Sequence, residues 1–119
     1  ITEGDTSFCF ATDHENADNQ RNQELLQLIQ NATLLVHDAQ FTEEEYQQKF
    51  KGWGHSSIER AITNAQAAQA QQLLLTHHDP GHSDDFLHTY LYRLKRSQSQ
   101  DTSVLKSIAL ASEKEIYTF

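Results

Sequence analysis

Three short apolar runs alternate with helical patterns along this chain of 119 residues, and a polar cluster follows each run at once. The runs cover residues 8–12, 33–36 and 73–76, which is the length of a buried strand and too short for a buried helix. Strands that alternate with helices predict crossover connections and strands that run in one direction. The expected fold class is therefore α/β, with a mostly parallel sheet flanked by helices.

Capping residues mark the expected start of each helix. Asp18 or Asn19 is the N-cap of the first helix, which should end near residue 31. Thr42-x-x-Glu45 forms a capping box over a short acidic helix, and Ser56-x-x-Glu59 forms another over an alanine-rich helix that runs to about residue 70. A last helix should begin after residue 83, residues 97–103 read as an internal polar linker, residues 104–110 as a packed segment, and residues 115–119 as an edge strand.

Composition limits the size and the partners of this protein. A chain of 119 residues fits one domain, and 9 Lys and Arg against 17 Asp and Glu give a formal charge of -8. This net negative charge repels polyanions and disfavours long nucleic acid as a partner. No apolar run approaches the eighteen or so residues of a membrane span. One cysteine, Cys9, excludes an internal disulfide and, with no signal-peptide pattern, favours a cytoplasmic location.

The beginning of the chain predicts a partial domain. The sequence contains no Met, and Ile1 leads directly into a polar turn, as if a hairpin had lost its first strand. We expect residues 1–119 to be a single, partial domain of a longer fold. A complete protein whose initiator was removed is the alternative.

Aspartate and histidine occur at the end of every expected strand. In a parallel sheet, ligands bind beyond the carboxyl ends of the strands, where the loops converge. Carboxylates and neutral imidazoles are zinc ligands, so the pattern favours half of a dinuclear site over histidines that merely hydrogen-bond within loops. The three clusters are Asp13-His14-Glu15, His37-Asp38 and His77-His78-Asp79.

Four motifs in this order carry a family resemblance. They are Thr12-Asp13, Leu35-Val36-His37-Asp38-Ala39-Gln40, Gly54-His55-Ser56-Ser57, and Leu74-Leu75-Thr76-His77. In order and spacing they resemble the later motifs of the metallo-β-lactamase-fold hydrolases, and they are most similar to the ribonuclease Z and cyclic-nucleotide phosphodiesterase branch. The resemblance covers about residues 7–90.

The resemblance implies roles for individual residues. Asp13 matches the aspartate that bridges two metal ions, and His77 matches the last histidine ligand. His37 matches a histidine near the scissile phosphate that supplies or accepts a proton, which makes it the expected catalytic residue.

Three further residues are expected to support the ligands or to contact substrate. His55 opens the alanine-rich helix and is expected to support a ligand, and Asp38 and His78 flank the matched ligands. Asp38 replaces the usual Glu and Gln40 the usual Thr, and these departures weaken an assignment to tRNA processing.

The His-x-His-x-Asp-His motif that supplies most ligands in this family does not occur in the sequence. The resemblance therefore implies the C-terminal half of an αββα sandwich, with two zinc ions in the complete site and the N-terminal half of the fold as partner. The expected substrate is a small or cyclic phosphodiester; a thioester or lactam is the alternative. The isolated piece should be inactive, and its exposed sheet face favours aggregation or a homodimer.

Two other classes of function fit part of the pattern. A phospho-acceptor signalling module of receiver type would use Asp38 as acceptor, with Thr76 and Lys106 as partners. A non-catalytic binding or dimerisation domain would hold no metal even when joined to the rest of the fold.

Overall fold

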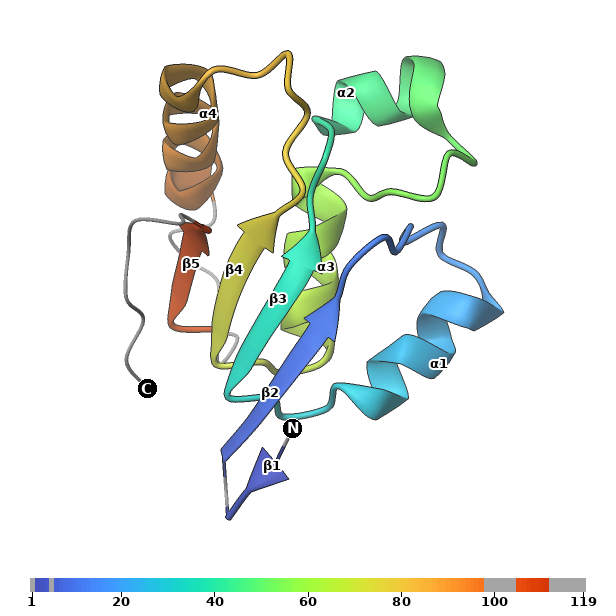
Figure 1. Cartoon of the computed structure of the whole chain (residues 1–119), viewed down its shortest axis with the longest axis vertical. Helices are drawn as coiled ribbons and strands as arrows, with labels where there is room; N and C mark the ends of the chain where they lie inside the picture. The colour runs from blue at the N-terminus through green and yellow to red at the C-terminus, as the bar shows by residue number, and fades with distance from the viewer. Residues whose placement is uncertain (1, 5, 98–104, 112–119) are drawn as a thin grey trace.

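The computed structural model describes residues 2–4, 6–97 and 105–111, which form one five-stranded sheet with helices packed against it (Figure 1). The strands lie in the order β1-β2-β3-β4-β5, with β2 to β5 parallel and β1 antiparallel to β2. The strands are β1 (Thr2–Glu3), β2 (Thr6–Ala11), β3 (Leu34–Asp38), β4 (Gln72–Thr76) and β5 (Ser107–Leu110). The mostly parallel sheet predicted from the sequence is confirmed. The short β1 pairs antiparallel with β2, and the expectation that residues 1–119 are a partial domain stays a prediction.

The helices cover one face of the sheet. The helical segments are α1 (Gln20–Leu28), α2 (Glu43–Glu45), the π-helix η1 (Tyr46–Phe50), α3 (Ile58–Ala67) and α4 (Asp84–Ser97). The strand order from β2 to β5 never reverses, and right-handed crossovers that step in one direction place their helices on the same side. Residues of α1, α3 and α4 accordingly share one core, and α3 lies behind the sheet in Figure 1. None of the described helices is long and apolar enough to cross a membrane.

The register of the strands assigns residues to the two faces. Rows that start at Cys9 and Ala11 continue through the neighbouring strands and point into the helix-covered core. The intervening row, Phe10–Val36–Leu74–Ala109, points to the opposite face. Phe10 keeps 63% of its surface exposed there, so part of that face is apolar and open to water.

Local capping signals predicted most helix starts. Asn19 caps α1 by accepting a hydrogen bond from the Asn22 amide, and the Thr42-Glu45 capping box is present. The expected box at Ser56 is wrong by one residue, because Ser57 accepts from the Arg60 amide and is the N-cap of α3.

The C-terminal expectations are tested only in part. β5 confirms a packed segment within residues 104–110, and Ser97 ends α4. Residues 98–103 of the expected linker and the expected strand at 115–119 lie outside the described residues.

Candidate metal centre

Two carboxylates and two imidazoles meet at the carboxyl ends of the parallel strands. Asp13 follows β2, Asp38 ends β3, His77 follows β4, and His55 precedes α3. Each offers one ligand atom, and these four atoms lie within 4.8 Å of one another. Imidazole nitrogens and carboxylate oxygens are the donors that zinc accepts, so the residues present fit this ion. We refer to these four residues as the ligand group.

Asp38 is fully buried and fixes the orientation of His55. Its Oδ2 accepts a hydrogen bond from Nδ1 of His55 at 2.6 Å, and its Oδ1 accepts one from the Ser56 amide at 3.2 Å. A carboxylate oxygen only accepts, so Nδ1 of His55 carries the hydrogen of this bond. A carboxylate that holds a histidine in one tautomer is the usual support of a metal-binding imidazole.

Asp13 and His77 stand at the exposed side of the ligand group. Oδ1 of Asp13 lies 3.7 Å from Nδ1 of His77 and 3.9 Å from Nδ1 of His55, and the two imidazole rings stack with centroids 4.5 Å apart. Both Asp13 and His77 have left-handed backbones, with φ of 51° and 61°. This conformation is uncommon outside glycine, and Asp18, Asn31 and Gln69 adopt it as well, outside the ligand group.

His37 lies apart from the ligand group, inside the core. Its Nδ1 donates to the Asp38 carbonyl at 2.8 Å, and its Nε2 accepts from Nδ2 of Asn64 at 3.0 Å. Burial lowers the pKa of His37 to about 4, so the ring is neutral at pH 7. Neither ring nitrogen is open to a substrate in this structure, and the proton-transfer role of His37 stays a prediction without support from its geometry.

His78 is half-buried in the loop after β4 and does not belong to the ligand group. Burial lowers its pKa, opposed by the backbone carbonyls of Ala39 and Leu75. Its expected contact with substrate stays a prediction.

Sequence reasoning assigned Asp38 and His55 a supporting role and missed the network behind them. The structure brings their donor atoms into the same group as Asp13 and His77. It also buries Asn64 on the sheet-facing side of α3, where its Oδ1 accepts from the side-chain amides of Asn16 and Asn22 at 3.0 and 2.9 Å. An amide among the buried alanines of a helix is the sequence signal that could have revealed this network.

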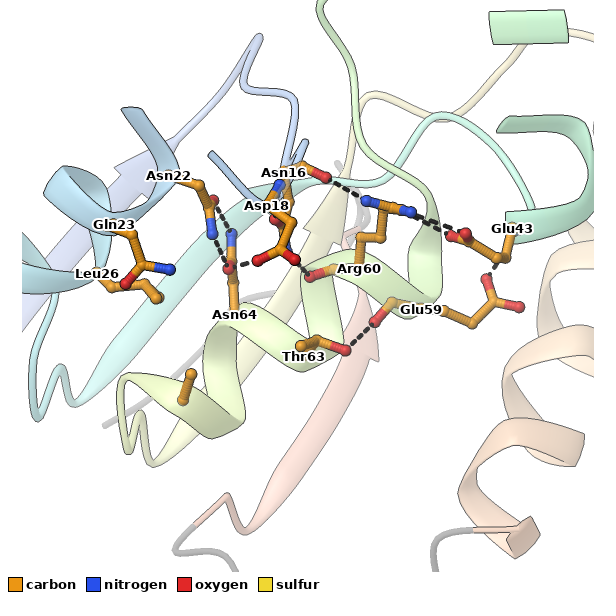
Figure 2. A pocket seen from close by; sticks show the side chains of 11 residues that line it. Asn16, Asp18, Asn22, Gln23, Leu26, Glu43, Glu59, Arg60, Thr63 and Asn64 are labelled. Atoms are coloured by element: carbon orange, nitrogen blue, oxygen red, sulfur yellow. Dashed lines mark hydrogen bonds and ion pairs between the residues drawn. The ribbon is translucent and has the colours of Figure 1, made fainter. Parts of the chain in front are cut away.

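Two cavities lie near these residues. One of about 340 Å³ opens beside the ligand group, and its lining is Asp13, His14, Glu15, Ala17, Asn19, Arg21, Gly52 and Gly54. Another, of about 470 Å³, lies between α1 and α3 with Asn22, Asn64 and Arg60 in its wall (Figure 2). No member of the ligand group lines this second cavity.

The receiver-type alternative is wrong. A receiver-type module needs its lysine, here Lys106, beside the phospho-acceptor Asp38. The amide of Lys106 donates to the Gln71 carbonyl, so Lys106 lies at the amino end of β4, whereas Asp38 lies at the carboxyl end of the sheet.

Comparison with known proteins decides the family. The family described as "Beta-lactamase superfamily domain" matches residues 1–78. The chain belongs to this family. Ribonuclease Z proteins of Bacillus cereus strains AH187, Q1 and ATCC 10987 are each 34% identical to it over 95 residues, which cover 80% of this chain and 25% of theirs. The chain thus spans about a quarter of the length of these curated relatives.

The fold of this beta-lactamase superfamily chain also matches a solved structure. The metallo-beta-lactamase fold protein YhfI from Bacillus subtilis superposes with a TM-score of 0.70 at 23% identity, over 98% of this chain and 42% of that one. The resemblance to metallo-β-lactamase-fold proteins near the ribonuclease Z branch and the α/β fold class are therefore confirmed.

Proposed function

We propose that this chain supplies part of a dinuclear zinc centre in a hydrolase that cleaves phosphodiester bonds. The observation that carries the proposal is the ligand group, two carboxylates and two imidazoles within 4.8 Å at the carboxyl ends of parallel strands. Membership of the beta-lactamase superfamily supports hydrolysis, and relatives named ribonuclease Z favour phosphodiesters among the possible substrates.

Each residue of the ligand group has a separate role in the proposed centre. Asp13 has a side chain that is 71% exposed, so both oxygens are accessible to a pair of cations. His77 is next to Asp13, and Asp38 orients His55 by accepting a hydrogen bond from its Nδ1. When bound, zinc would act as a Lewis acid that lowers the pKa of water and stabilises charge on the phosphoryl group. The remaining zinc ligands would come from the N-terminal part of the longer fold, which we propose as the intramolecular partner of this chain.

The chain's charge and the cavity beside Asp13 favour a small substrate. A formal charge of -8 repels long RNA, whereas a cavity of about 340 Å³ suits a mononucleotide or cyclic nucleotide. Arg21 brings a guanidinium that can pair with a phosphodiester to a cavity wall that also holds the Asp13 and Glu15 carboxylates.

Substitution of Asp13 tests the proposal in the complete gene product. Asp13→Ala should remove bound zinc and phosphodiesterase turnover together, because the carboxylate is expected to hold both ions. Zinc is measured by elemental analysis, and turnover with a chromogenic phosphodiester and with cyclic nucleotides. Asp18→Ala is the matched control, since Asp18 is exposed in the same loop and lines only the second cavity.

Zinc content and turnover that both survive Asp13→Ala would show that this aspartate is not the bridging ligand. A complete gene product that binds no zinc would favour the non-catalytic binding domain.

A further inference from the structure

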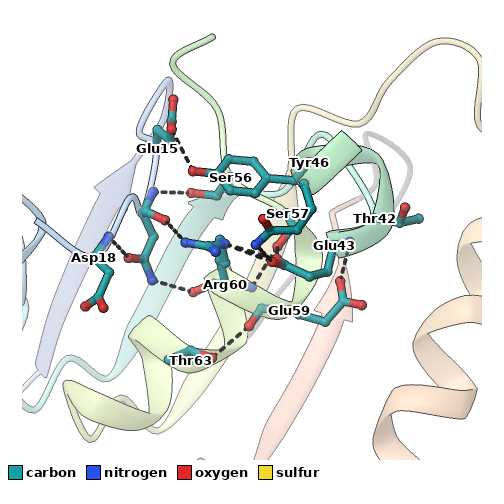
Figure 3. A network of polar contacts seen from close by, with 12 residues as sticks. Glu15, Asp18, Thr42, Glu43, Tyr46, Ser56, Ser57, Glu59, Arg60 and Thr63 are labelled. Atoms are coloured by element: carbon teal, nitrogen blue, oxygen red, sulfur yellow. Dashed lines mark hydrogen bonds and ion pairs between the residues drawn. The ribbon is translucent and has the colours of Figure 1, made fainter. Parts of the chain in front are cut away.

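Glu15 joins the two loops that carry Asp13 and His55 of the ligand group. The Asp13 loop (residues 12–19) connects β2 to α1, and the His55 loop (residues 51–57) connects η1 to α3. Oε1 of Glu15 accepts a hydrogen bond from the Gly54 amide at 2.8 Å. Its Oε2 accepts one from the Gly52 amide at 3.0 Å and one from the Tyr46 hydroxyl at 2.7 Å. Figure 3 shows the Glu15 carboxylate turned toward the Tyr46 hydroxyl.

We propose that Glu15 is a positioning residue whose carboxylate holds the His55 loop against the Asp13 loop and so sets the geometry of the ligand group. The metal affinity in this proposal rests on the proposed function, whereas the connection between the loops does not. Glu15 is two residues from Asp13, and Gly54 directly precedes His55. A displacement of either loop therefore changes the separation between the Asp13 carboxylate and the His55 imidazole.

The glycines of the His55 loop permit this arrangement. Gly52 and Gly54 have φ of +84° and +92°, a conformation that other residues adopt at a cost. It allows the amides on either side of Trp53 to donate to one carboxylate. The Trp53 side chain stays 63% exposed and meets the Phe50 ring edge to face, with centroids 5.0 Å apart.

Other contacts keep the two loops folded when Glu15 is changed. The Ser56 hydroxyl donates to the His14 carbonyl at 2.7 Å and accepts from the Asn16 amide at 2.8 Å. Arg60 donates to the Asn16 carbonyl at 2.8 Å, and its guanidinium lies 4.3 Å from the centre of the Tyr46 ring. Substitution of Glu15 should therefore loosen the His55 loop without unfolding the chain.

Glu15→Gln is the decisive variant, because it preserves shape and removes one acceptor. The amide nitrogen of Gln must face at least one of the three donors, so one loop contact becomes a donor-donor clash. Glu24→Gln is the matched control, since it makes the same charge change at an exposed position of α1. Tyr46→Phe removes one donor and leaves both glycine amides on Glu15.

The fluorescence anisotropy of this chain and the zinc affinity of the complete gene product separate loop positioning from general stability. Trp53 is the only tryptophan, so time-resolved fluorescence anisotropy reports the mobility of the His55 loop directly. Zinc affinity, measured at a temperature where circular dichroism shows every variant folded, reports the ligand group. Visible spectra with Co²⁺ in place of Zn²⁺ report its coordination geometry.

We expect Glu15→Gln to increase Trp53 mobility, to weaken zinc binding about tenfold or more, and to change the Co²⁺ spectrum. Tyr46→Phe should produce smaller changes in the same direction, and Glu24→Gln none. Mobility or zinc affinity for Glu15→Gln equal to that of Glu24→Gln would overturn the proposal. If the unaltered complete gene product binds no zinc, the metal function fails, and the anisotropy of Glu15→Gln alone decides whether Glu15 holds the loop.

Discussion

His37 shows how burial changes the role of a residue that the sequence places in a catalytic motif. Both ring nitrogens are engaged by protein groups, and the side chain has no exposed surface. The same ring connects the end of β3 to Asn64 on α3, and through Asn64 to Asn22 on α1. At the scale of single residues, Asp13, Asp38, His55 and His77 form the ligand group, whereas His37, Asn22 and Asn64 fasten helices to the sheet behind it.

His37→Ala tests which of these two roles the residue has. If His37 fastens the core, the free energy of unfolding should fall by about 2–4 kcal/mol, because a cavity forms and the Asp38 carbonyl loses its donor. Urea unfolding measures this change, and His88→Ala at an exposed position of α4 is the control. A variant of the complete gene product that keeps its stability but loses turnover about a hundredfold would instead establish proton transfer by His37.

The element that most constrains the architecture is α3. Its buried residues are Ile58, Ala61, Ile62, Asn64 and Ala65, and the two alanines let that part of the helix approach the sheet closely. Its N-terminus is fixed by Ser57, which accepts from the Arg60 amide and donates to Glu43 at 2.6 Å. The position of the helix therefore depends on the Ser57 cap at its start and on the small side chains of Ala61 and Ala65 on its buried face.

Two alanine-to-leucine substitutions on α3 test how closely the helix packs against the sheet. Ala65→Leu should lower the free energy of unfolding by about 1–3 kcal/mol, because Ala65 has no exposed surface and added methyl groups must displace the sheet. Ala67→Leu makes the same change on the exposed side of the helix and should leave stability nearly unchanged. Thermal unfolding followed by circular dichroism compares the two. Equal stability for both variants would contradict the close packing.

At the scale of the whole molecule, the two faces of the sheet differ. Helices α1, α3 and α4 pack on one face, whereas Phe10 on the other is 63% exposed. An exposed aromatic ring in a sheet favours association with another apolar surface. We therefore expect pairing between copies of this chain through the Phe10 face.

Sedimentation at increasing protein concentration tests this pairing. Phe10→Thr should shift the chain toward monomer, because it removes the exposed ring and keeps a residue that favours strands. Tyr92→Gln removes a ring of similar exposure from α4 and should not change the association. A monomeric unaltered chain, or equal association in both variants, would refute pairing through this face.

The sequence alone determined the order and direction of the elements, since apolar runs, capping residues and glycines act within a few positions along the chain. It also placed aspartates and histidines at strand ends, from which a shared site follows because parallel strands end at one edge. The helix caps illustrate these local signals. Asn19 caps α1, and Thr42 and Glu45 form the capping box of α2, as their positions in the sequence predict.

Only the tertiary structure decided which polar side chains meet. Ser56 and Ser57 are the same residue type side by side, and contacts with the Asp13 loop decide that Ser57 caps α3. Asp38 and His37 are likewise neighbours, and the alternation of a strand turns the imidazole into the core. Such choices depend on hydrogen bonds between residues dozens of positions apart, and no local pattern encodes those distances.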